Sequence, residues 1–119
     1  MGDIKLGAVE THFAEIIWAH ESITTGQLVK LCADELQWKR TTTYTVLKKL
    51  SEKGIFKTEN SIVTAVITKQ EFEAMQSEQF VEENFKGSLP AFLAAFSTRK
   101  KLTDKEIEEM KNLIEQMRG

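Results

Sequence analysis

Apolar residues recur at helical spacing near the start of the chain. Val9, Phe13, Ile16 and Ile17 share one face of a 3.6-residue period, and the charged residues between them fall on the other faces. This pattern predicts an amphipathic helix from Ala8 to about His20.

A capping box marks the start of the next helix. Thr24-Thr25-Gly26-Gln27 places a hydroxyl three residues ahead of a glutamine, the arrangement that satisfies two free amides at a helix start. We treat Ser22-Ile23 as a short break and expect a second helix to about Leu36, a turn, and a third helix over residues 41–53. The expected inward positions of the third helix are Thr43, Val46, Leu47 and Leu50. Gly54 ends it, because glycine readily takes the positive φ that follows a last turn.

Two β-rich runs follow Gly54. Residues 55–58 and 62–67 are rich in β-branched and aromatic side chains, and Glu59-Asn60-Ser61 between them predicts a short hairpin turn. Three helices followed by a hairpin is the element order of a winged helix-turn-helix. We therefore assign residues 1–69 to a winged-helix domain.

Residues 70–119 change to a purely helical pattern. We expect helices over 69–86 and from Pro90 through Phe96, then a basic linker over 98–102 and a last helix after the capping box Thr103-Asp104-Lys105-Glu106. These helices have no further sheet or core to cover, so a second copy of the chain is the economical partner for their apolar faces. The expected dimerisation residues are Phe80, Phe85, Leu89, Phe92, Leu93, Phe96, Ile107, Met110, Leu113, Ile114 and Met117. The predicted fold class is mainly α with a small β-hairpin: a winged helix-turn-helix head plus a C-terminal helical dimerisation region.

The charge distribution changes the functional interpretation of the head. A net charge of −2 and a pI near 5.7 argue, as averages, against a nucleic-acid binder. From Lys39 to Lys57, however, six basic residues stand against the single acid Glu52, a local excess of +5. This concentration around the third helix indicates a surface for double-stranded DNA.

The threonine-rich start of the third helix suits contacts to phosphates and base edges. We expect base reading by Thr42, Tyr44 and Thr45, with Arg40 and Thr41 contacting either bases or phosphates. The expected phosphate contacts are Lys39, Lys48, Lys49 and Lys57, and the expected wing contacts are Lys57, Asn60 and Ser61. The simpler alternatives are that Thr42 and Thr45 cap the helix or bond back to the carbonyl four residues earlier, and that Tyr44 covers the edge of the core.

The stretch from Trp38 to Gly54, WKRTTTYTVLKKLSEKG, resembles the recognition-helix signature of the penicillinase repressor (BlaI/MecI/CopY) family. Residues 15–25 and 85–96 are similar to the first helix with its helix-turn entry, and to the segment that leads into the dimerisation region. The resemblance implies a homodimeric repressor on a palindromic operator, controlling a β-lactamase or other antibiotic-resistance response. In antibiotic-responsive members a membrane sensor-protease system triggers cleavage of the repressor at an Asn-Phe pair. That pair falls on Ala95-Phe96 here, with Ala in place of Asn.

Other classes of function find little support in the sequence. No nucleophile, phosphate-loop or metalloprotease motif is present, so we expect no enzyme and no cofactor. Two separate histidines, His12 and His20, make a poor metal set, and the Cys-x-Cys motifs of the copper-responsive branch are missing because no Cys follows Cys32. A lone cysteine, no signal segment and no membrane insertion favour the cytoplasm. The alternative that stays open is a winged-helix protein-interaction module without direct DNA binding.

Overall fold

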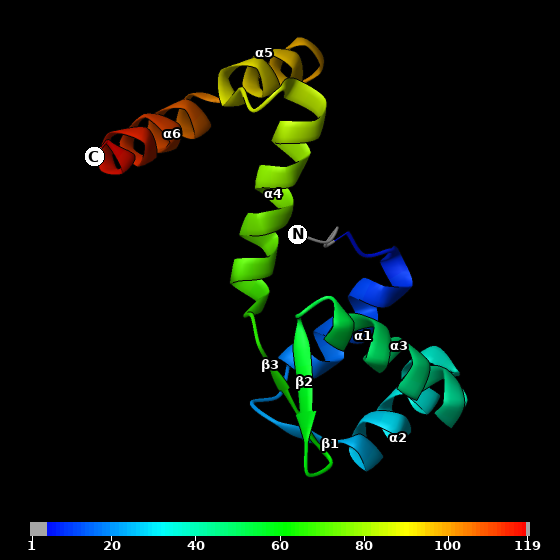
Figure 1. Cartoon of the computed structure of the whole chain (residues 1–119). Helices are drawn as coiled ribbons and strands as arrows, with labels where there is room; N and C mark the ends of the chain where they lie inside the picture. The colour runs from blue at the N-terminus through cyan, green and yellow to red at the C-terminus, as the bar shows by residue number, and fades with distance from the viewer. Residues whose placement is uncertain (1–4, 119) are drawn as a thin grey trace. The chain divides into compact units, whose positions relative to one another are not determined.

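The structure is a computed structural model that describes residues 5–118. Figure 1 shows the succession of its elements. In chain order they are α1 (Ala8–Trp18), β1 (Ile23–Thr24), α2 (Thr25–Leu36), α3 (Arg40–Glu52), β2 (Phe56–Glu59), β3 (Ile62–Ala65), α4 (Lys69–Phe85), α5 (Leu89–Arg99) and α6 (Asp104–Met117). The predicted class, mainly α with a small antiparallel sheet and the element order of a winged helix, is confirmed.

The chain divides into two compact units, with the boundary between Ser77 and Glu78. We call them the head and the tail. The expected domain boundary after residue 69 precedes this division, because the first turns of α4 pack with the head. Phe72 of α4 is only 2% exposed and belongs to the same buried cluster as the side chains of α1 and α3.

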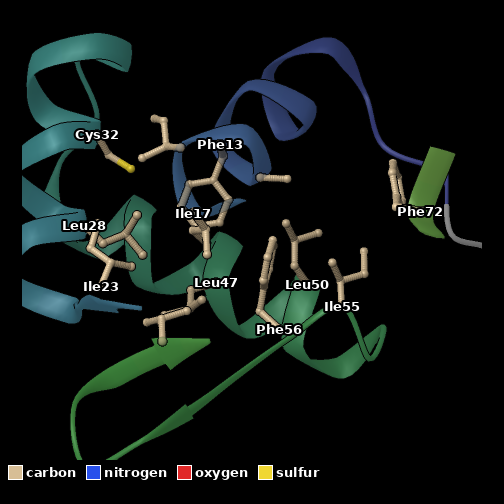
Figure 2. Close-up of a cluster of buried hydrophobic side chains, with 13 residues drawn as sticks. Phe13, Ile17, Ile23, Leu28, Cys32, Leu47, Leu50, Ile55, Phe56 and Phe72 are labelled. Atoms are coloured by element: carbon tan, nitrogen blue, oxygen red, sulfur yellow. The ribbon is translucent and has the colours of Figure 1, made fainter. Parts of the chain in front are cut away.

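The head is built around one apolar core (Figure 2). Phe13 and Ile17 come from α1, Leu28 from α2, Leu50 from α3 and Phe56 from β2, and all are buried. Aromatic contacts extend this core to its edges. The Phe13 ring stacks on Trp38 at 5.4 Å between centroids.

Trp18 joins α1 to the wing and to α4. Its ring lies 5.4 Å from Phe56 and 5.3 Å from Phe72, between centroids. The indole Nε1 donates a hydrogen bond to the Ile67 carbonyl at 3.1 Å, so its polar atom is satisfied although the residue is half-buried.

The sheet has three antiparallel strands in the order β1-β3-β2. Of the short break expected at Ser22-Ile23, Ser22 lies outside any strand, whereas Ile23 begins β1, because it pairs with Val63 across the sheet. The hairpin turn is shorter than expected: Glu59 pairs with Ile62, so only Asn60 and Ser61 form the loop, both at positive φ (52° and 62°). Two residues in this conformation match the right-handed twist of the flanking strands.

Both capping boxes form as predicted. The Thr24 hydroxyl accepts from the Gln27 amide at 3.1 Å, while the Gln27 side-chain oxygen accepts from the Thr24 amide at 3.0 Å. Thr103 and Glu106 make the same pair of bonds at the start of α6. Gly54 has φ of 82° after α3, as its place after the last turn requires.

The tail lacks a buried core of its own among the described residues. No residue of α5 or α6 is buried, although four phenylalanines of α4 and α5 contact one another in series. These are Phe80, Phe85, Phe92 and Phe96.

We predict that Phe72→Ala lowers the free energy of unfolding of the head by about 3–5 kcal/mol, since it removes a buried ring and leaves a cavity. Fluorescence-monitored denaturation measures this directly, because both tryptophans of the chain, Trp18 and Trp38, lie in the head. Phe80→Ala is the matched control on the same helix, where the ring is 49% exposed. Equal denaturation midpoints for the two variants would contradict the assignment of Phe72 to the head core.

Candidate nucleic-acid interface

One face of α3 is buried and the opposite face is exposed. Thr43, Leu47 and Leu50 are buried against the rest of the head, and Val46 is partly buried. The sequence placed these four positions inward, and the burial confirms it. The exposed residues of α3 are Arg40, Thr41, Thr42, Tyr44, Thr45, Lys48, Lys49 and Glu52.

The buried seam between α2 and α3 contains two polar groups. The Thr43 hydroxyl has no hydrogen-bond partner of good geometry, and it lies beside the thiol of Cys32. Burial raises the pKa of Cys32, the Thr43 hydroxyl lowers it in part, and the thiol is fully buried. A protonated, inaccessible thiol is unreactive, so Cys32 serves as a packing residue of the core.

The first turn of α3 is open at its N-terminal end. Lys39 is the N-cap residue, and no side chain caps the helix there. Backbone amides at this end carry the positive pole of the helix dipole and lack intrahelical partners. An anion approaching Arg40 and Thr41 would therefore meet both side-chain and backbone donors.

The threonine hydroxyls of α3 differ in their bonding. Thr45 donates from Oγ1 to the Thr41 carbonyl at 2.9 Å, so the alternative of a bond back to the preceding turn applies to it. Its methyl group and hydroxyl lone pairs stay available, because the residue is exposed. Thr42 is exposed as well and makes no such bond within the described part of the chain.

Tyr44 is held by its neighbours on both α3 and α2. The guanidinium carbon of Arg40 lies 5.6 Å from the centroid of the Tyr44 ring, within cation–π distance. The pKa of Tyr44 is lowered mainly by a hydrogen bond from the Thr25 hydroxyl, with a smaller contribution from the Arg40 charge. Tyr44 thus lies beside the start of α2, in the same groove as Thr25.

Among the lysines of α3 and β2, Lys49 and Lys57 lie beside a carboxylate, whereas Lys48 makes no ion pair within the described residues. Lys48 is exposed and lines an open groove of about 330 Å³ with Thr25, Tyr44, Leu47, Ser51 and Thr58. Lys49 turns toward α1, where its Nζ donates to a Glu10 carboxylate oxygen at 2.7 Å. Lys57 is exposed and lies 3.4 Å from Glu59 of the same strand.

The groove beside Lys48 contains residues that the sequence did not point to. Thr25 begins α2, Ser51 lies near the end of α3 and Thr58 lies on β2. Their hydroxyls share one groove only because three separate elements pack together, so no linear spacing indicates them. The capping box was the one local signal at Thr25.

The tip of the wing is fixed to the start of α2. The Thr25 amide donates to the Ser61 carbonyl at 2.9 Å, while Asn60 and Ser61 themselves are exposed. A backbone hydrogen bond therefore joins the wing residues expected to meet DNA to the start of α2.

The histidines of the head form ordinary polar contacts. His12 Nε2 lies 3.2 Å from a Glu35 oxygen, and His20 Nδ1 lies 2.9 Å from the Ile16 carbonyl. Within residues 5–118, no group of three or more His, Cys, Asp or Glu is arranged to hold a metal ion. None of the helices described in that range has the length and apolar character needed to cross a membrane.

The tail exposes apolar side chains beside an apolar groove of about 430 Å³. The groove lies between α5 and α6 and is lined by Leu89, Pro90, Phe92, Leu93, Met110, Leu113, Ile114 and Met117. Seven of the expected dimerisation residues line it, whereas Phe80, Phe85, Phe96 and Ile107 do not. Leu113 is 55% exposed and Met117 is 70% exposed.

The chain is similar over most of its length to members of one protein family. The penicillinase repressor family model matches residues 6–116. The penicillinase repressor of Bacillus licheniformis is 23% identical over 116 residues, which cover 94% of this chain and 91% of the relative. The methicillin resistance regulatory protein MecI of Staphylococcus aureus (strain Mu50 / ATCC 700699) is 22% identical over 114 residues, or 92% of this chain and 93% of the relative. Among solved structures, the reduced form of MarR from E. coli superposes with a TM-score of 0.49 and 19% identity, covering 97% of this chain and 76% of that chain.

We predict a pH-dependent contribution of the Glu10–Lys49 pair to stability. The Lys49 ammonium is the main cause that lowers the pKa of Glu10 below its ordinary value of 4.5, so the stabilisation is present above that pH and is lost as the pH falls through the lowered pKa of the folded state. Glu10→Gln should cost about 0.2–1 kcal/mol near pH 7, and the difference from the native chain should shrink in acid.

Denaturation midpoints at pH 7 and pH 3 measure this difference. Glu52→Gln serves as the control, since Glu52 is exposed on α3 and makes no ion pair within residues 5–118. A Glu10→Gln deficit that stays constant between the two pH values would rule out the pair as its source.

Proposed function

The chain belongs to the penicillinase repressor family, and from this premise we propose that it is a DNA-binding transcriptional repressor that acts as a homodimer on a palindromic operator. The observation that carries the proposal is the division of α3 into a buried apolar face and an exposed face of threonines and basic residues. A helix presented in this way can enter the major groove while the remainder of the head stays outside it.

The N-terminal half of α3 is the part that reaches base edges in this arrangement. Thr42 and Thr45 offer hydroxyls and methyl groups, which can meet base donors and acceptors and the methyl group of thymine. Lys39 and Lys48 supply cations for the phosphates on either side, and Lys57, Asn60 and Ser61 extend the contact along the wing. Lys49 can contact a phosphate only if its ammonium leaves the Glu10 carboxylate, which lies 2.7 Å away.

A second copy of this chain is the partner that we propose for the tail. Helices without buried residues are unstable as isolated elements, because apolar packing supplies most helical stability in proteins. The apolar groove between α5 and α6 and the exposed Leu113 and Met117 provide a surface that a copy of the same tail can cover. Twofold pairing would place two α3 helices on successive major grooves, one helical turn of DNA apart.

The regulated response that we propose is antibiotic resistance, with a membrane sensor-protease system as a partner. The relatives are named for penicillinase repression and methicillin resistance, which supports this assignment. The Ala95–Phe96 bond lies within α5, and proteases generally act on locally unfolded chain, so cleavage there requires unwinding of that helix. A cut at this bond would separate α6 from the rest of the groove and thereby weaken the dimer.

We predict that Lys48→Ala reduces the salt dependence of DNA binding. Removing one phosphate contact lowers the slope of log affinity against log salt by about 0.9 per protomer, measurable by fluorescence anisotropy on a duplex from the promoter of the protein's own gene. Lys49→Ala is the matched neighbour and should leave the slope nearly unchanged. If the native protein binds no promoter duplex at low salt, the protein-interaction module is favoured instead. If the native protein and Lys48→Ala show equal slopes of log affinity against log salt, Lys48 is rejected as a phosphate contact.

We predict that Leu113→Asp converts the protein to monomers, because it places a charge on the apolar surface that the second copy covers. Light scattering should give twice the chain mass of 13.6 kDa for the native protein and the single mass for the variant. Lys111→Asp, on an exposed position of the same helix outside the groove, is the control and should remain dimeric. A single-chain mass for the native protein would refute the assignment of the tail.

A further inference from the structure

Arg40 and Tyr44 form a cation–π pair on the exposed side of α3. They are four residues apart, the spacing at which side chains on a helix meet, and the guanidinium carbon lies 5.6 Å from the ring centroid. No carboxylate lies within ion-pair distance of Arg40 in the described part of the chain, in contrast to Lys49 and Lys57. The charge of Arg40 is therefore not neutralised by the protein.

The Tyr44 side chain also lies beside the start of α2. Thr25, the first residue of α2, lines the same groove as Tyr44, and its side chain is the largest cause that lowers the pKa of Tyr44. The polar end of the tyrosine therefore lies beside α2, while 37% of the residue stays exposed. Its ring offers a fixed platform for the arginine rather than a free side chain for a base.

Stacking leaves the hydrogen-bonding edge of a guanidinium open. The group is planar with five N–H donors, so a ring against its face does not block donors that point outward in its plane. The platform also restricts the rotamers of a long side chain, which lowers the entropy lost when that side chain binds. A hydrogen bond from Arg40 is among the causes that lower the pKa of Tyr44, so one donor faces the tyrosine and the other N–H donors at this first residue of α3 remain for a ligand.

We propose that Arg40 reads a guanine in each operator half-site, and that Tyr44 is a positioning residue that holds Arg40 for this contact without touching a base itself. The inference rests on the proposed DNA-binding function and specifies what the DNA must contain. Guanine matches the donor set because its major-groove edge presents two acceptors, O6 and N7, at the spacing of a guanidinium fork. The first turn of the recognition helix is the part that approaches those edges.

The first experiment selects bound duplexes from a randomised DNA pool with the native protein and with Arg40→Ala. We expect one guanine per half-site to be enriched by the native protein and to lose its enrichment with Arg40→Ala. Recovery of no specific sequence by the native protein would refute the proposed function itself. Enrichment of the same guanine by both proteins would refute the role of Arg40 alone, so the two failures are distinct.

A modified base tests the contact at the level of one atom. Replacing the selected guanine by 7-deazaguanine removes the N7 acceptor and keeps Watson–Crick pairing. The native protein should lose between about 5-fold and about 150-fold in affinity, the range for a bidentate base contact, whereas Arg40→Ala should bind both duplexes equally. A native protein indifferent to the modification would place Arg40 on a phosphate and overturn the proposal.

The role of Tyr44 is tested by a ring-conserving and a ring-removing variant. Tyr44→Phe retains the platform and should keep the guanine preference, while Tyr44→Leu should weaken binding by about two- to fivefold, the range for a solvent-exposed cation–π contact. In the Arg40→Ala background, Tyr44→Leu should have no further effect. A changed preference at a different base pair in Tyr44→Leu would show that Tyr44 reads a base and would overturn its positioning role.

The titration of Tyr44 gives a readout that does not depend on DNA. Tyr44 is the single tyrosine of the chain, so the absorbance of its phenolate reports this residue alone. Its pKa lies below the ordinary value of 10.0, and both Thr25→Val and Arg40→Ala should raise it, the former more, since the Thr25 hydroxyl is the larger cause. A pKa unchanged by both substitutions would contradict the geometry on which the proposal rests.

Discussion

The burial of one face of α3 is the constraint on which the rest of the molecule depends. Leu47, Leu50 and Thr43 lie against the apolar residues of α1 and α2, and a helix fixed on one side must show the other to solvent. The exposed side carries Arg40, Tyr44 and Lys48. The surface proposed to face DNA is therefore a consequence of core packing, and a change in the core that rotated α3 would remove this surface without altering any of its residues.

The wing is tied to this arrangement by backbone hydrogen bonds as well as by apolar packing. β1 pairs with β3, and the Thr25 amide bonds to the Ser61 carbonyl, so the hairpin tip and the start of α2 form one connected framework. Thr25 also lines one groove with Tyr44, whose ring in turn lies against the Arg40 guanidinium. A single residue at the start of α2 thus lies between the wing and α3.

Head and tail differ in whether their apolar residues are buried within a single chain. The head buries Phe13, Leu28 and Phe56 within one chain, whereas α5 and α6 bury no residue among those described. Proteins rarely leave large apolar patches uncovered. This difference explains why loss of the proposed pairing would act on DNA binding without requiring the head to unfold, since two linked heads gain affinity that one head lacks.

The sequence by itself determined the order of the helices and the hairpin, the capping boxes at Thr24 and Thr103, the inward face of α3 and the apolar stripes of the tail. These features depend on local periodicity and local hydrogen bonds, which a linear pattern contains. Only the tertiary structure decided that Ile23 joins a strand, that Lys49 turns to Glu10, that Phe72 belongs to the head, and that Thr25 meets Tyr44. Each of these contacts joins residues far apart along the chain or on different elements, so their partners become neighbours only when the helices and strands pack.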